Sequence, residues 1–311
     1  MRRAVAALLL CLAWLLAGCG SSEQTVHNPP AAPLESRVLA SGNIPRVRAA
    51  DLARPIAAYR RYVLAELGPM QGDVGRLQSA VAAGDLAAAR RAWLAADGRY
   101  EAIGAAYGAF GDLDASINGE PGGLAGGVRS AQFTGLHRIE LALWGRGSTA
   151  DASPFAARLA SDLRRLRRAV PGIEIEPLEY VLRCHEVLEG SLDLQLSGRA
   201  SPWSGDALVA LRSNLRGTEV VLGSLRPLIA RRNRQILPAI DASLLALRRE
   251  LRSVALPGGS MPRWDKLPAA ERTLIAGRAA AAAESLAYVP EVVDPRPPLP
   301  QKSALGTEEA G

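Results

Sequence analysis

The sequence predicts an all-α fold of antiparallel helix bundles, and three observations lead to this prediction. Alanine, leucine and arginine dominate residues 47–289, where no run alternates apolar and polar residues as a half-buried strand does. Leu86, Trp93, Tyr100 and Tyr107 recur every seven residues and therefore share one helix face. Proline and glycine interrupt the sequence at intervals of helical length. Helices of this length joined by short turns pack side by side as antiparallel neighbours.

The same periodicity and punctuation define the individual helices. They are expected at residues 49–68, 70–83, 85–109, 131–145, 153–169, 177–197, 206–235, 237–254 and 267–288. Asp85 is a favourable N-cap for the third of them. Because this is too many helices for one four-helix bundle, we expect two packed four-helix-type bundles that meet near Pro171-Gly172.

The first residues have the pattern of a secretory signal. Arg2 and Arg3 precede an uncharged apolar run, residues 4–16, which is shorter than a comfortable membrane span. Leu16-Ala17-Gly18-Cys19 then resembles the bacterial lipobox, in which the cysteine is lipidated. We therefore expect a cell-envelope lipoprotein, anchored through Cys19 to the outer face of the cytoplasmic membrane or lying in the periplasm. The alternative is an ordinary cleaved signal in which Cys19 is incidental.

Composition shifts divide the chain into four expected parts. Residues 1–18 are the lipoprotein signal peptide, and residues 19–46 are a polar, proline-containing flexible tether. Residues 47–289 form the helical domain. Residues 290–311 are rich in proline and then polar, which predicts a disordered tail.

Charge and cysteine content narrow the possible functions. The formal net charge of +6 is modest and spread along the chain, and aromatic residues make up only 5%. No basic run is interleaved with aromatic residues, so nucleic-acid binding is not expected. Cys11 is removed with the signal and Cys19 takes the lipid, which leaves Cys184 without a partner for an intramolecular disulfide.

One region combines residue types that bind metals. His137 and Glu140 are three residues apart, so a helix presents them on one side. The glycine-rich loop 111–133 precedes them, and Asp97 and Glu101 stand at i and i+4 in the helix before that loop. Like charges at this spacing repel unless something neutralises them. An imidazole beside carboxylates can bind a metal, whereas the alternative is a solvated acidic face with a surface ion pair.

Three stretches of this region resemble a known family. They are Tyr100-Glu101, FGDLDASIN at residues 110–118 and FTGLHRIELALW at residues 133–144. Together they resemble the imelysin family, specifically its EfeO/EfeM branch of bacterial iron-uptake lipoproteins, whose hallmark is G-x-H-x-x-E. The resemblance extends over residues 47–290. It implies an all-helical imelysin-like fold with an iron or other divalent-metal site on the hallmark helix.

The resemblance also implies individual ligands. His137 and Glu140 match the hallmark, Glu101 matches the acid that follows the tyrosine, and Asp114 matches the aspartate of the Leu-Asp pair. The implied metal is iron, as Fe²⁺ or Fe³⁺, with Zn²⁺ or Cu²⁺ as alternatives. No catalytic residue is implied.

This chain departs from the family pattern in two ways. Gly104 and Asn118 stand where a second glutamate and a second aspartate commonly fall, which implies a less acidic pocket. Longer EfeO members also carry an N-terminal cupredoxin domain. The residues between Cys19 and the helical region are too few for a β-sandwich, so this domain is expected to be absent or supplied by another chain.

The expected function follows from the resemblance. It is a lipid-anchored component that captures iron and passes it to a membrane permease, with a peroxidase-type partner as a further component of the system, and it is not an enzyme. Two alternatives stay open, an imelysin-type metallopeptidase and a lipoprotein that binds an alginate-like polymer. A zinc peptidase commonly carries H-E-x-x-H, and this sequence lacks that motif.

A second histidine lies close to an acidic residue in the sequence. His185 and Glu189 stand at i and i+4, and Cys184 is adjacent. His185 falls in register with a stripe of leucines in the helix expected at residues 177–197, which favours a packed core histidine. A metal ligand is the alternative.

Overall fold

The computed structural model describes residues 46–295. Within this range the regular segments are all helical and no strand occurs, which confirms the all-α prediction. None of the described helices is long and apolar enough to cross a membrane. The predicted signal peptide, Cys19 and nearly all of the tether lie outside the described residues, as does the tail beyond residue 295.

Eleven α-helices are described, and two groups follow from their order along the chain. The helices before Pro171 are α3 (Ala49–Ala82), α4 (Leu86–Glu101), α5 (Tyr107–Phe110), α6 (Asp112–Asn118), α7 (Gly135–Glu140) and α8 (Thr149–Ala169). Those after it are α9 (Pro177–Gly190), α10 (Ala207–Asn233), α11 (Leu237–Ser253), α12 (Ala269–Leu286) and α13 (Tyr288–Val293).

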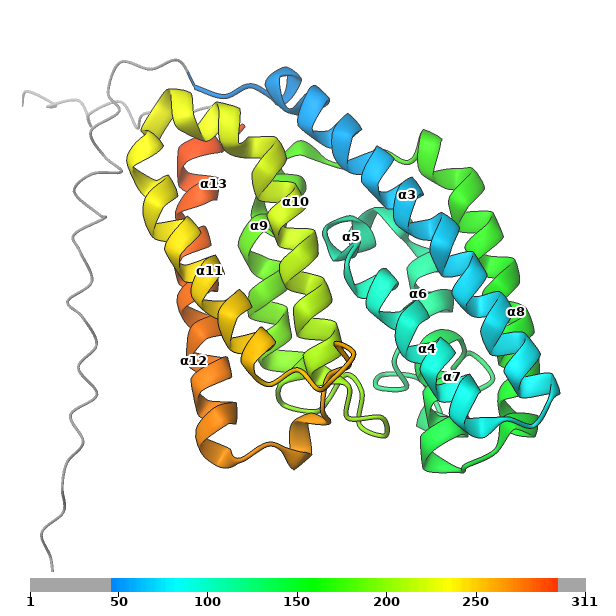
Figure 1. Cartoon of the computed structure of the whole chain (residues 1–311). Coiled ribbons are helices and arrows are strands. Elements are labelled where there is room, and N and C mark those ends of the chain that lie inside the picture. The colour runs from blue at the N-terminus through cyan, green and yellow to red at the C-terminus, as the bar shows by residue number, and fades with distance from the viewer. Residues whose placement is uncertain (1–45, 296–311) are drawn as a thin grey trace, which may run out of the picture. The chain divides into compact units, whose positions relative to one another are not determined.

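The helices make most of their contacts within these two groups. In the first group α3 packs against α4 and α8, and α6 and α7 pack against α8. In the second, α9 contacts α10, α12 and α13, while α11 packs against α12 (Figure 1). α10 also reaches the first group through contacts with α3 and α4. The arrangement as two four-helix-type bundles that meet near Pro171-Gly172 stays a prediction, because α9 and α10 also contact α3.

The predicted break at Gly68-Pro69 is wrong, because α3 runs through both residues. A proline inside a helix loses one backbone hydrogen bond and crowds the preceding turn. Leu67 and Met70 lie on either side of Gly68-Pro69, and both side chains are fully buried. Burial of such side chains contributes about 1.5–3 kcal/mol each, which offsets the cost of the proline.

The helix expected at residues 85–109 ends early, at Glu101, and a 3₁₀ turn at Gly104–Ala106 and α5 follow. α10 crosses the chain at this point. A Cβ atom on Gly217 of α10 would lie 2.3 Å from the carbonyl oxygen of Ala102, so only glycine allows this approach. The N-cap prediction is confirmed, since Asp85 accepts a 2.8 Å hydrogen bond from the N–H of Ala88.

Two further boundaries differ from the sequence prediction. The loop expected at residues 111–133 contains a short helix, α6. At the other end, α13 continues through Val293, past residue 290 where the tail was expected to begin. Val292 and Val293 are buried, so this segment belongs to the packed domain.

Candidate metal centre

A close backbone approach fixes the start of the hallmark helix α7. Gly135 has φ of +75°, and a Cβ atom there would lie 2.2 Å from the carbonyl oxygen of Ile117 at the end of α6. Any other residue would overlap that carbonyl. The indole nitrogen of Trp93 donates a 2.9 Å hydrogen bond to the carbonyl of Leu136, which joins α7 to α4. The glycine of the motif is therefore needed to seat the helix, because α6 and α7 touch here.

Thr134 occupies the N-cap position of α7 but makes no capping hydrogen bond with its side chain. Its hydroxyl is buried without a partner among the described residues.

His137 and Glu140 project from α7 into the interior, where their side chains are 3% and 0% exposed. Nδ1 of His137 lies 3.5 Å from Oε2 of Glu140, at the outer limit of a hydrogen bond. A metal-binding histidine commonly directs one ring nitrogen at a carboxylate and binds the metal with the other. Nε2 is therefore the nitrogen of His137 that could bind a metal.

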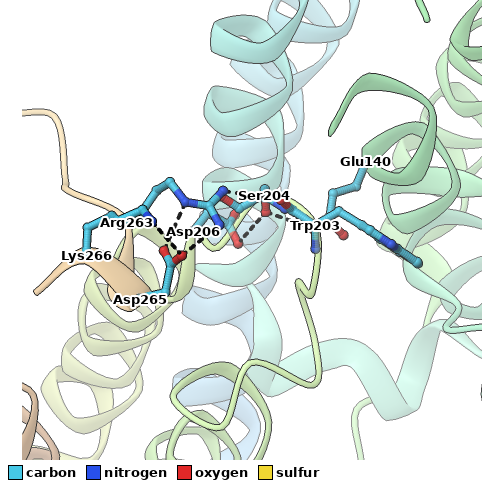
Figure 2. A network of polar contacts seen from close by, with 7 residues as sticks. All are labelled: Glu140, Trp203, Ser204, Asp206, Arg263, Asp265 and Lys266. Carbon is cyan, nitrogen blue, oxygen red and sulfur yellow. Dashed lines mark hydrogen bonds and ion pairs between the residues drawn. The ribbon is translucent and has the colours of Figure 1, made fainter. Parts of the chain in front are cut away.

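The second oxygen of Glu140 is held by the turn before α10 (Figure 2). Oε1 accepts hydrogen bonds from the backbone N–H groups of Trp203, at 3.1 Å, and Ser204, at 2.7 Å. Ser204 Oγ lies 2.8 Å from the same oxygen and 3.1 Å from Oδ1 of Asp206. Since a hydroxyl has one proton, it can donate to only one of these two carboxylates at a time.

Glu101, the last residue of α4, faces two side-chain amides. Its Oε2 accepts hydrogen bonds from Asn214 Nδ2 at 2.8 Å and from Gln195 Nε2 at 3.3 Å. Burial raises the pKa of Glu101 to about 7, and the Asn214 bond only partly opposes this. Asp206 raises the pKa further, and His137 lowers it.

Asp114, on α6, is held by a tyrosine pair. Tyr100 donates a 2.7 Å hydrogen bond to Asp114 Oδ1 and stacks on Tyr107, with ring centroids 4.8 Å apart. Burial raises the pKa of Asp114, while Tyr100 and His137 oppose the shift.

The structure adds two carboxylates to the predicted set, Asp97 and Asp206. Both are buried, and no N–H or O–H donor of the described residues reaches Oδ2 of either, although the two carboxyl groups interact with each other. Burial raises the pKa of Asp97, and so does the charge of Asp206. The charges of Glu101 and Glu140 raise it further. Burial and the charge of Glu140 raise the pKa of Asp206. The sequence analysis noted the i, i+4 spacing of Asp97 and Glu101 but did not assign Asp97 as a ligand.

Asp206 was missed entirely. It lies far from α7 in sequence, and no motif surrounds it. A short Ser-x-Asp pattern ahead of a helix, Ser204 to Asp206, is its only local signal, and that pattern is also typical of a helix cap.

These residues form what we call the buried acidic cluster, which has several carboxyl groups and few positive charges. Its members are Asp97, Glu101, Asp114, His137, Glu140 and Asp206. Burial opposes protonation of His137, yet the pKa of His137 is raised because Glu140, Glu120 and Glu101 outweigh burial. No arginine or lysine is among the main influences on the pKa values of Asp97, Glu101 and Asp206. Buried carboxylates without a cation must bind protons or a positive ligand.

One nitrogen and several carboxylate oxygens form a donor set that suits iron and its neighbours. The neighbouring carboxyl groups of Asp97 and Asp206 could share a proton or bind a cation in its place. No three histidine, cysteine or acidic side chains in residues 46–295 already stand in metal-binding geometry. The groups interact through their charges, and binding would require rotamer changes to bring them onto one ion.

Four other positions singled out in the sequence supply no carboxylate to the cluster. Asp112 is exposed, and His185 pairs with Glu189 at 3.8 Å, its side chain 15% exposed. Asn118 carries a buried amide oxygen without a donor among the described residues. Gly104 is buried beside Tyr107 and Asn214. Gly104 and Asn118 therefore add no carboxylate to the interior, whereas the buried Asp97 and Asp206 do.

Comparison with known proteins identifies the family. The imelysin family, also described as peptidase M75, matches residues 55–288. The chain belongs to the imelysin family. This match covers every residue of the buried cluster and confirms the resemblance carried by the G-x-H-x-x-E motif.

Several relatives carry names from iron uptake. The chain is 27% identical over 236 residues to the iron uptake system component EfeM of Pseudomonas syringae pv. syringae (strain B728a), covering 76% of this chain and 83% of that protein. It is 30% identical over 238 residues to the iron uptake system component EfeO of Yersinia pseudotuberculosis (strain IP32953), covering 76% and 63%. For EfeO of Escherichia coli (strain K12) the identity is 28% over 239 residues, covering 77% and 64%. The chain thus spans less than two thirds of the length of these EfeO proteins.

Proposed function

We propose that this protein is the extracytoplasmic, lipid-anchored iron-binding component of an iron-uptake system. One observation carries the proposal. Asp97, Glu101, His137 and Asp206 are all buried, their charges shift one another's pKa values, and no arginine or lysine is among the main influences on them. The names of the EfeM and EfeO relatives support iron as the cargo.

Each side chain has a role in this proposal. His137 provides Nε2, and Glu101 and Asp114 provide oxygen, as the family resemblance implies. Asp97 and Asp206 supply further oxygens. Both oxygens of Glu140 are engaged, so in this conformation Glu140 orients the imidazole of His137 and becomes a ligand only if its bonds to residues 203–204 open.

The chemistry of the cluster suits reversible capture. Its donors are harder than thiolates, so Fe²⁺ and Fe³⁺ fit, and Zn²⁺ or Cu²⁺ would compete through the imidazole. Because the carboxyl groups have raised pKa values, protons compete with the metal, and a more acidic surrounding favours release. A lipid on Cys19 and the tether would hold this domain near a membrane permease that receives the iron, with a peroxidase-type partner as a further component of the system.

Peptidase activity is the minor alternative. A zinc peptidase needs three protein ligands, an open coordination position and a base that acts on the bound water. Glu140 is not free for that role, because the N–H groups of Trp203 and Ser204 already bind one of its oxygens. We therefore assign no catalytic residue, and a protease assay beside the binding experiment checks this.

Anaerobic titration calorimetry with Fe²⁺, with Zn²⁺ as a comparison, tests the proposal. We expect micromolar or tighter binding and at least a tenfold weaker affinity for His137→Ala, which corresponds to about 1.4 kcal/mol. His185→Ala is the matched control, because His185 is paired with Glu189 on α9. Absence of binding to Fe²⁺, Fe³⁺, Zn²⁺ and Cu²⁺ would refute the proposal, as would an equal loss in the control.

A further inference from the structure

A cavity of about 590 Å³ lies between α4, α10 and α11, apart from the buried acidic cluster. This volume is in the range of small-molecule sites. Leucine, valine and methionine side chains form part of its wall. Its charged lining consists of Arg99, Arg212, Arg216, Arg248, Arg252 and Glu219.

Carboxylates neutralise some of these arginines. Arg99 lies 2.6 Å from Asp73 and 3.2 Å from Glu66, and Arg216 lies 3.1 Å from Glu66. Arg248 pairs with Glu219. These three guanidinium groups are therefore partly satisfied and serve mainly to hold the helices together.

Arg212 and Arg252 are different, because neither forms an ion pair with a carboxylate of residues 46–295. Arg212 donates a 2.7 Å hydrogen bond to the carbonyl of Gly259, which fixes its side chain at the cavity wall. Partial burial lowers the pKa of the otherwise exposed Arg212, and the neighbouring charge of Arg216 lowers it further. The cavity thus contains positive charge that the protein leaves uncompensated.

We propose that this cavity binds a small organic anion with two or more carboxylate or phosphate groups. Guanidinium groups bind both kinds of group through paired N–H donors, and Arg212 and Arg252 are the two with donors to spare. The apolar part of the wall, including Leu251 and Met261, favours a carbon frame over an inorganic ion.

The proposed site is separate from the metal centre, although both use α4 and α10. Gly98 and Arg99 line the cavity, whereas Asp97 and Glu101 belong to the acidic cluster. A Cβ atom on Gly98 would lie 3.0 Å from Oγ of Ser213, so the two helices are in close contact between the sites. The anion proposal therefore does not depend on the proposed function.

Titration calorimetry on the metal-free protein tests the inference with two organic probes, citrate as a tricarboxylate and fructose 1,6-bisphosphate as a bisphosphate. We expect at least one to bind with a Kd below about 1 mM, a typical weak-ligand affinity. Acetate and inorganic phosphate at equal ionic strength should bind at least tenfold more weakly. The tighter organic probe identifies which anionic group the cavity prefers.

Variants locate the binding. Arg212→Ala combined with Arg252→Ala should weaken the tighter probe at least tenfold, and both residues are exposed enough for the fold to persist. Arg249→Ala is the control, because Arg249 is exposed on α11 outside the cavity and should change the affinity less than twofold. The inference is overturned if neither organic probe binds below 1 mM, if inorganic phosphate binds as tightly, or if the control loses as much affinity.

Discussion

The backbone N–H of Ser204 donates a 2.7 Å hydrogen bond to Oε1 of Glu140, which joins the hallmark helix α7 to the turn before α10. The network continues outward, because Arg263 donates hydrogen bonds to the carbonyls of Trp203 and Ser204 and pairs with Asp265 (Figure 2). The carboxylate of Glu140 therefore holds two parts of the chain together beside His137.

Glu140→Ala should lower the free energy of unfolding by about 3 kcal/mol, because it leaves the N–H groups of Trp203 and Ser204 buried and unpaired. Ser204→Ala is the matched comparison. It removes one hydroxyl but keeps both backbone donors, so its cost should be about 1 kcal/mol. Urea unfolding of the metal-free protein measures both. A loss below 1 kcal/mol for Glu140→Ala would contradict this account of the turn.

Gly135→Ala should destabilise the protein by about 3 kcal/mol or more, because the new methyl group would overlap the carbonyl of Ile117. Gly147 provides the control. It also has positive φ, +65°, but a Cβ atom there meets nothing within 4 Å. Gly147→Ala should therefore cost only the backbone strain, about 1–2 kcal/mol. Equal urea midpoints for the two variants would show that the approach of α6 to α7 is not tight.

The metal-free protein should become less stable as the pH rises from about 5 to 8. Burial raises the pKa of Glu101 to about 7, and the pKa values of Asp97, Asp206 and His137 are also raised in the folded state. A raised folded pKa means that the folded protein holds protons which the unfolded chain releases. The stability that these groups contribute is fully present below their pKa in the unfolded chain. It is lost as the pH rises through their pKa in the folded protein.

Thermal melts at constant ionic strength check this pH dependence. Glu101→Gln should flatten the curve, because a neutral amide at this position needs no proton. An added metal should raise Tm more at pH 7.5 than at pH 5.5, since the metal replaces protons that bind tightly at low pH. A melting temperature that rises with pH in the metal-free protein would contradict the buried acidic cluster.

The anchor prediction rests on Leu16-Ala17-Gly18-Cys19, which lies outside the described residues. Cys19→Ala should leave the chain unacylated, so it would be released or would accumulate as uncleaved precursor. Palmitate labelling and membrane fractionation measure this. Unchanged labelling and fractionation of the variant would refute the lipobox.

Much of the fold was predictable from local signals. The apolar periodicity identified the helices, and Asp85 marked the start of α4 correctly. Local signals failed where distant packing decided the outcome. Leu67 and Met70 keep α3 continuous through Pro69, and α10 meets the chain at Gly217 just beyond the end of α4.

The candidate site shows the same division. The spacing of His137 and Glu140 and the family resemblance found the helix that carries the hallmark. Asp206 had no comparable signal, because its burial next to Asp97 results from the packing of α10 against α4. The hydrogen bond between Ser204 and Glu140 could not be predicted either, because the two residues come together only in the folded chain.

Anomalous diffraction at the iron absorption edge, from crystals soaked anaerobically in Fe²⁺, tests the central claim most directly. The account predicts one dominant anomalous peak within coordination distance of His137 Nε2, with carboxylate oxygens of Glu101 and of Asp97 or Asp206 also on the ion. Asp206→Asn crystals treated in the same way should show a weaker peak. Wild-type crystals with no peak in this cluster, or with the dominant peak at His185, would contradict it.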